Sequence, residues 1–143
     1  MNMEFSKQCL FCRIAEKKLV AWVVHEDDHS LAFLDIQPRA PGHTMVIPRR
    51  HAATLFDLSP EEIGPLFSAV QKVARRVSGA LGAEGLTMGI NHGRVSGQVV
   101  DHLHIHILPR FGSDRGGSIQ SVVNNPREGS LEEMAKKIRE TAL

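Results

Sequence analysis

One long amphipathic helix gives the clearest periodic pattern in the chain. Apolar side chains recur three or four positions apart, as on one face of a helix, at Leu66, Val70, Val73, Val77 and Leu81. The Ser59–Glu62 capping box, with Pro at the first helical position, predicts where this helix begins, and Gly82 predicts where it ends. We expect Pro65 to break its first turn, because proline has no backbone N–H to donate.

Shorter apolar and β-branched runs predict strands on both sides of that helix. The runs are residues 19–25, 30–36, 43–47, 86–91 and 98–108. Acidic residues 26–28 separate the first two runs and predict a hairpin. Short helices are predicted at residues 11–18 and after a second capping box, Ser130–Glu133. This order predicts an α+β fold in a single domain over residues 1–143, with a mostly antiparallel five-stranded sheet, one long helix and a short C-terminal helix.

Composition and charge exclude several classes of protein. The 143 residues include 17 Lys and Arg against 16 Asp and Glu, and this balance gives no basic face for nucleic acid. The longest purely apolar run, residues 19–24, is far shorter than the ~20 residues of a membrane helix. Residues 1–8 lack the apolar core of a signal peptide, and only two cysteines are present. We therefore expect a cytoplasmic protein without membrane or nucleic-acid partners.

Three histidines alternate with aliphatic residues in the last predicted strand. Alternation would place His102, His104 and His106 on one exposed or cleft-facing side, and Leu103 and Ile105 against the long helix. Neighbouring histidines would lie roughly 6.6 Å apart along the backbone, so all three cannot easily be ligands of one metal ion. A line of imidazoles suits a phosphate chain, and imidazole can act as nucleophile or general acid and base near neutral pH. A metal patch and three unrelated surface histidines are the alternatives.

The loop that leads into this strand offers further groups for binding an anion. Gly93 and Gly97 allow backbone amides to approach a phosphate closely, while Ser96 and Gln98 can donate hydrogen bonds. Most glycine-containing connections between strands are only turns. Next to three histidines, the phosphate-binding interpretation is the better one.

The stretch from His102 to Leu108, HLHIHIL, resembles the signature of the histidine triad (HIT) superfamily. Residues 31–51, 54–62, 91–98 and the Pro109-Arg110 pair are also similar to parts of these proteins, so the resemblance covers roughly residues 9–112. The chain looks like a bacterial-type Hint/Fhit-like member, which implies the HIT-like fold. A histidine at the last triad position and the short chain speak against the uridylyltransferase branch.

The resemblance implies cleavage at the α-phosphorus of a nucleoside 5′-phosphate derivative. It assigns the nucleophile to His104, a hydrogen bond to the phosphoryl oxygens or leaving group to His106, and support of the nucleophile to His102. Asp35 is similar to the residue that receives the ribose hydroxyls. The other nucleotide contacts implied in this way are Phe33, Leu34, Ile36, Asn91, Gly97, Gln98 and Val99.

Two of these positions have a structural role as the alternative, and a third differs from the residue common in the family. Phe33 and Ile36 resemble the wall of a base pocket, but alternating apolar residues of a strand are often simply core. Val99 stands where the Hint branch commonly carries Ser, which removes a hydroxyl donor to the α-phosphate. That change is consistent with slower turnover or with a different leaving group.

Cys9 and Cys12 have a spacing more typical of metal or redox sites than of a structural disulfide. They supply two of the four ligands that a structural zinc requires. Bacterial-type relatives with such a pair suggest His51 and His102 as the other two. His102 would then be structural and not catalytic. Two reduced thiols without a metal are the alternative.

Three functions of different classes fit these features. The first is a hydrolase or transferase acting on a nucleoside phosphoramidate or a dinucleoside polyphosphate through a nucleotidyl-histidine intermediate. The second is a nucleotide-binding regulator with vestigial hydrolysis, and the third is a small zinc-stabilised interaction module. The resemblance also implies a purine nucleotide or nucleotide conjugate as partner, and a homodimer that pairs through the long helix and a strand edge.

Overall fold

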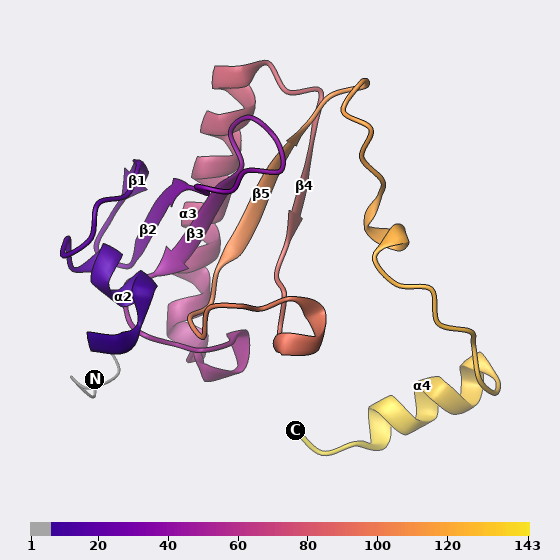
Figure 1. Ribbon diagram of the computed structural model, residues 1–143. Helices are drawn as coiled ribbons and strands as arrows, with labels where there is room; N and C mark the ends of the chain where they lie inside the picture. The colour runs from indigo at the N-terminus through magenta and orange to yellow at the C-terminus, as the bar shows by residue number, and fades with distance from the viewer. Residues whose placement is uncertain (1–6) are drawn as a thin grey trace.

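One antiparallel sheet organises the chain, which the computed structural model describes over residues 7–143. The strand order is β1-β2-β3-β5-β4, and every neighbouring pair is antiparallel. The strands are β1 Val23–Glu26, β2 Ser30–Leu34, β3 Thr44–Pro48, β4 Gly85–Gly89 and β5 Ile105–Arg110. The described α-helices are α2 Leu10–Ala15, α3 Pro60–Leu81 and α4 Leu131–Glu140. The predicted α+β fold with a five-stranded antiparallel sheet is confirmed (Figure 1).

Each face of the sheet carries its own apolar cluster, because successive strand residues point to opposite sides. The cluster under α3 contains buried residues of β2, β3, the triad segment and the helix, among them Ala32, Val46, Leu66, Val73, Leu103, Ile105 and Ile107. The cluster under α2 contains Phe11, Ala15, Leu31, Phe33, Met45 and Ile47. The prediction that the aliphatic residues of the triad pack against the long helix is therefore confirmed.

Helix α3 has the predicted bounds and the predicted buried face. It begins after the Ser59 capping box and ends at Gly82, which adopts a left-handed conformation. The expected break at Pro65 is wrong, because the helix continues through it. The N–H that Pro65 lacks would serve the carbonyl of Glu61, which lies on an exposed residue that water can reach.

The C-terminal end of α3 lies close to the turn that precedes β3. Gly42 in this turn has a φ of +83°, which side chains with a Cβ rarely adopt. A Cβ built on Gly42 would also collide with the Leu81 side chain at the end of the helix. The backbone conformation of the turn therefore favours glycine, and a Cβ would also require the Leu81 side chain to move.

Three predicted boundaries are wrong by several residues. Helix α2 ends at Ala15 and not at residue 18, because Lys17 takes a left-handed conformation with a φ of 60°. The first strand begins only at Val23. The last strand begins at Ile105 and not at residue 98, because β3 pairs with it only as far as Val46 opposite Ile105. His102 and His104 therefore precede the strand.

The C-terminal helix α4 forms where the second capping box predicts it, and Figure 1 shows it standing apart from the sheet. No helix among residues 7–143 is long and apolar enough to cross a membrane. The N-terminal segment in which we expect no export signal, residues 1–8, lies mostly outside the described residues.

Candidate functional site

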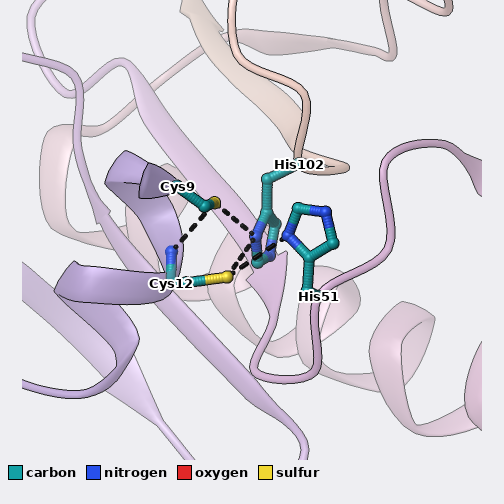
Figure 2. A group of neighbouring side chains, drawn as sticks. All are labelled: Cys9, Cys12, His51 and His102. Atoms are coloured by element: carbon teal, nitrogen blue, oxygen red, sulfur yellow. Dashed lines mark hydrogen bonds between the residues drawn. The ribbon is translucent and has the colours of Figure 1, made fainter. Parts of the chain in front are cut away.

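Two cysteines and two histidines from three separate parts of the chain meet beside the sheet (Figure 2). Cys9 caps the N-terminus of α2, where its sulfur accepts the backbone N–H of Cys12 at 3.3 Å. His51 follows β3, and His102 precedes β5. The potential ligand atoms of all four side chains lie within 4.8 Å of one another. The structure thus brings together the four residues that the sequence suggests as zinc ligands.

The distances among these atoms suit a tetrahedral zinc ion. The sulfur of Cys12 lies 3.3 Å from Nδ1 of His51 and 3.4 Å from Nδ1 of His102, and the sulfur of Cys9 lies 3.4 Å from that same nitrogen. Zinc bonds of ~2.3 Å to sulfur and ~2.0 Å to nitrogen imply a separation of roughly 3.5 Å between ligands at tetrahedral angles. Two thiols and two imidazoles are also among the ligand sets that zinc prefers.

His102 is oriented as a metal ligand requires. Its Nε2–H donates to the carbonyl of Pro48 at 2.8 Å, so the lone pair of the neutral ring is on Nδ1, which faces the cysteines. Burial lowers the pKa of His102 to about 4, with the neighbouring His51 and His104 adding to the effect. The prediction that all three triad histidines line an exposed or cleft-facing side is wrong for His102, which is fully buried and points toward the cysteines.

His104 is held so that Nε2 of its neutral ring carries no proton. Its Nδ1 lies 2.7 Å from the backbone carbonyl of His102, and a carbonyl can only accept, so Nδ1 carries the proton of the neutral ring. Nε2 therefore has the free lone pair. The Phe11 ring packs edge-on against His104, with the ring centroids 5.2 Å apart. The imidazole is nearly buried, and two independent contacts fix its orientation.

His43 is part of this site, although our sequence analysis did not single it out. Its Nδ1 accepts the backbone N–H of Arg39 at 3.2 Å, so the proton of the neutral ring lies on Nε2. Nε2 is 2.8 Å from Nδ1 of His106 and 3.6 Å from the carboxylate of Asp35. One feature of the sequence could have pointed to His43. It directly precedes β3, the strand that pairs with β5, and Met45 of β3 lies opposite His106.

This chain of hydrogen bonds determines where the proton of His106 lies. Because His43 donates to Nδ1 of His106, the proton of the neutral His106 ring is on Nε2. The His106 ring lies next to that of His104, with a centroid distance of 5.0 Å. The site therefore presents a nitrogen lone pair on His104 beside an N–H donor on His106.

Acidification should destabilise the fold through His106. Burial lowers the pKa of His106 to about 4, with the nearby His104 and His43 adding to the effect. Between pH 6.5 and 4 the unfolded chain binds a proton at this residue that the folded chain does not, so the free energy of unfolding falls with falling pH. Urea denaturation should show a steeper fall for the wild type than for His106→Asn, by up to roughly 3 kcal/mol. If the free energy of unfolding changed with pH in the same way in both proteins, His106 would not be the cause of the effect.

The loop before the triad is folded by its own side chains. Gln98 accepts the N–H of Gly93 at 2.9 Å and donates to the carbonyls of Ala53 at 2.7 Å and Val100 at 3.1 Å. The hydroxyl of Ser96 donates to backbone carbonyls of the same loop. Both donors that the sequence offers for a phosphate are thus engaged with the backbone, and the backbone N–H groups of Gly93, Ser96, Gly97 and Gln98 also donate within this loop.

The remaining implied nucleotide contacts differ in their exposure. Phe33 is buried in the cluster under α2, where its ring packs edge-on against Phe11, as the core alternative describes. Ile36 and Val99 are 84% and 79% exposed, so neither belongs to the core. The other implied contacts, Leu34, Asp35, Asn91 and Gly97, are partly buried or exposed.

Phe11 is the second residue that the sequence analysis missed as part of the site. It lies between the predicted zinc ligands Cys9 and Cys12, and its ring reaches both His104 and Phe33. No motif marks Phe11 beyond its place between the two cysteines. Its role became visible only when α2 was placed on the sheet.

Comparisons with known proteins agree with this geometry. A family model, the HIT domain, matches residues 16–113. The adenosine 5′-monophosphoramidase hnt1 of Schizosaccharomyces pombe is 39% identical over 108 residues, which are 76% of this chain and 78% of the relative.

Solved structures extend the similarity to nearly the whole chain. The crystal structure of a Streptococcus mutans UA159 protein has a TM-score of 0.83 and 33% identity, covering 98% of this chain and 85% of that one. A Zn-bound histidine triad family protein from Mycobacterium smegmatis has a TM-score of 0.72 and 33% identity, covering 94% and 92%. Because the family model spans well over half of the sequence and includes the whole triad, this chain belongs to the HIT family.

Proposed function

We propose that the protein is a nucleotide hydrolase or transferase that cleaves at the α-phosphate of a nucleoside 5′-phosphate derivative. The observation that carries this proposal is the pair of proton positions in the site. The His102 carbonyl keeps Nε2 of His104 unprotonated, and His43 keeps a proton on Nε2 of His106. A nucleophile and a hydrogen-bond donor side by side are what substitution at phosphorus requires.

The reaction then runs in two balanced steps. The lone pair on Nε2 of His104 attacks the α-phosphorus, and the bond to the leaving group breaks as that group takes the electron pair and a proton from solvent water. His106 supports this step by donating its Nε2–H to the phosphoryl oxygens or to the leaving group. Water then attacks the nucleotidyl-histidine and releases one proton to the solvent, the phosphorus–nitrogen bond breaks with its electron pair returning to Nε2, and a nucleoside monophosphate leaves with His104 restored.

The same proposal assigns the nucleotide contacts. Asp35, partly buried and 3.6 Å from His43, receives the ribose hydroxyls. Asn91, Gly97 and Gln98 form the loop assigned to the phosphate and ribose, and Leu34 and Ile36 line the base, while Phe33 belongs to the core under α2. Val99 adds no hydroxyl donor, so the α-phosphate depends on backbone amides and His106. The base is a purine in this assignment.

A structural zinc held by Cys9, Cys12, His51 and His102 belongs to this proposal. The short distances, the donor set and the lone pair of His102 support it, as does the Zn-bound relative. When bound, the metal acts as a cross-link between α2 and the two segments that carry the histidines. The side chain of His102 then has a structural role, while its carbonyl positions His104.

We also propose a cytoplasmic homodimer. Free thiols at Cys9 and Cys12 suit a reducing compartment. Strand β4 forms one end of the sheet, and beside it α3 borders an open apolar groove of about 620 Å³ whose lining includes Phe67, Val70 and Met88. A second copy placed across this groove would cover it.

A substrate panel tests the proposed activity. We expect release of adenosine monophosphate from both adenosine 5′-phosphoramidate and a diadenosine polyphosphate, because the attacked atom is the same in each. The name of the fission yeast relative favours the phosphoramidate as the faster substrate. Product chromatography at saturating substrate gives the two turnover numbers. Binding of both nucleotides in calorimetry without turnover would instead support the nucleotide-binding regulator.

A further inference from the structure

The two cysteines of the chain lie one helical turn apart at the start of α2. The carbonyl of Cys9 accepts the backbone N–H of Arg13 at 3.1 Å, so the hydrogen-bond pattern of the helix already includes Cys9. Cα atoms three positions apart in a helix are separated by roughly 5 Å. A disulfide requires about 4.4–6.8 Å between its Cα atoms. The backbone of Cys9 and Cys12 is therefore spaced for a disulfide.

The side chains of the pair also point to the same place. The sulfur of Cys9 accepts the backbone N–H of Cys12 at 3.3 Å, and this contact holds it over the first turn of the helix. Both sulfurs lie 3.4 Å from Nδ1 of His102 (Figure 2). The two sulfurs are thus within 4.8 Å of each other. Rotation of the two side chains is the movement that a bond between them requires.

The two thiols differ in their access to solvent. Cys9 is partly exposed, whereas Cys12 is buried and only 2% exposed. An oxidant from solution therefore reaches the sulfur of Cys9, while the sulfur of Cys12 is shielded from direct attack. An accessible cysteine beside a second, protected cysteine is the arrangement in which a sulfenic acid is captured as a disulfide.

We propose that Cys9 and Cys12 form a reversible disulfide with a hydroperoxide as the oxidant, and that this modification excludes zinc from the cluster with His51 and His102. The sulfur of Cys9 attacks one oxygen of hydrogen peroxide, the oxygen–oxygen bond breaks, and the thiol proton leaves with the departing oxygen as water. The sulfur of Cys12 then attacks the sulfenic sulfur of Cys9, and the Cys12 proton leaves with the hydroxyl group as a second water. Two thiols and one peroxide thus give one disulfide and two waters.

This inference rests on the zinc site proposed above and adds a chemical change that empties it. Zinc binds cysteine as the thiolate, and a disulfide sulfur no longer carries that charge. Oxidation of the pair and binding of zinc therefore exclude each other. When the cysteines react as thiolates, the two protons that form water come from the solvent.

Phe11 connects the modification to the proposed nucleophile. It lies between the two cysteines in the chain, and its ring packs edge-on against the rings of His104 and His102, with centroid distances of 5.2 Å and 6.0 Å. Closing the bond between Cys9 and Cys12 changes the first turn of α2, which carries Phe11. It also removes the metal cross-link to His102, whose carbonyl orients His104. The oxidised protein therefore turns over more slowly than the reduced one.

Treatment of the purified protein with hydrogen peroxide tests the modification and the exclusion of zinc together. A chromogenic zinc chelator should record the release of close to one zinc per chain. Peptide mapping should find Cys9 linked to Cys12, and dithiothreitol should restore both thiols and zinc uptake. His51→Asn is the matched variant, since it keeps both cysteines but lacks one zinc ligand, and it should form the same disulfide. Cys9→Ser should form no disulfide within the chain.

Several outcomes of this treatment would overturn the proposal. Oxidation of Cys9 to a sulfinic acid without a bond to Cys12 overturns it, and so does a disulfide that joins two chains. Zinc that stays bound after the disulfide has formed overturns the exclusion. A disulfide formed in protein that carries no zinc as purified supports the modification and overturns the zinc site.

Nuclear magnetic resonance of the histidine rings tests the connection through Phe11. The ring signals of His104 should shift on oxidation and return with dithiothreitol, while those of His29, on the exposed hairpin, should not change. Turnover of adenosine 5′-phosphoramidate should fall at least ten-fold in the oxidised form. Unchanged signals of His104 overturn the connection. If neither form turns over the substrate, the proposed activity fails, while zinc release and peptide mapping still decide the disulfide.

Discussion

Replacing His104 by Asn should lower turnover of adenosine 5′-phosphoramidate by at least roughly a thousand-fold while nucleotide binding changes little. The variant keeps a side chain that can donate to the His102 carbonyl, but it has no nitrogen lone pair to attack phosphorus. Loss of a group that acts only in the reaction lowers the turnover number and not the affinity. Steady-state kinetics and calorimetry with adenosine monophosphate measure the two quantities.

A matched variant and a direct observation sharpen this test. His29→Asn makes the same chemical change on the exposed hairpin between β1 and β2 and should keep wild-type turnover. Mass spectrometry of reactions quenched without acid should find a nucleoside monophosphate adduct on the peptide that contains His104. If the adduct maps to another residue, or if His104→Asn turns over normally, the nucleotidyl-His104 mechanism is wrong.

Protein purified without a histidine tag should contain close to one zinc per chain, and Cys12→Ser should lose it. Burial and the neighbouring Cys9 raise the pKa of the Cys12 thiol to about 12 when no cation is bound. A metal must therefore displace a proton that the site otherwise retains, and zinc uptake should release protons. Loss of the cross-link should lower the melting temperature by roughly 10 °C, given the usual relation between stability and melting temperature.

Elemental analysis and thermal unfolding measure these two effects. His51→Asn should lose the metal as Cys12→Ser does, while the exposed His29→Asn should retain it. Unchanged zinc in Cys9→Ser would refute this set of ligands. Wild-type protein without any zinc, but with normal stability, would favour the alternative of two reduced thiols.

Local patterns in the sequence were enough to predict most of the architecture. Helix α3 follows from its capping box, its apolar period and Gly82, all of which lie within one short segment. The packing of Ile105 and Ile107 against that helix follows from simple alternation along a strand. These features could be predicted because the signal and the structure that it determines are close together in the chain.

The parts that depend on distant segments could not be predicted in this way. Alternation places His102 with His104 and His106, but His102 turns inward because the cysteines of α2 lie beneath it. The inclusion of His43 and Phe11 depends on how β3 and α2 pack against the triad segment, which no local pattern encodes. Pro65 shows the opposite case, since the helix continues through a local helix breaker where the unpaired carbonyl of Glu61 is open to water.

Gly42 contacts none of the reacting groups of the proposed site, yet the site depends on the turn that it forms. His43 follows directly, and its neighbours in the hydrogen-bond chain are Asp35 and His106. A side chain at position 42 would strain the turn that leads directly into His43, because the φ of +83° favours glycine. In a library of random variants, this position should therefore tolerate change as poorly as the histidines do. A search for functional residues by tolerance to mutation would then rank a turn glycine beside the histidines of the proposed site.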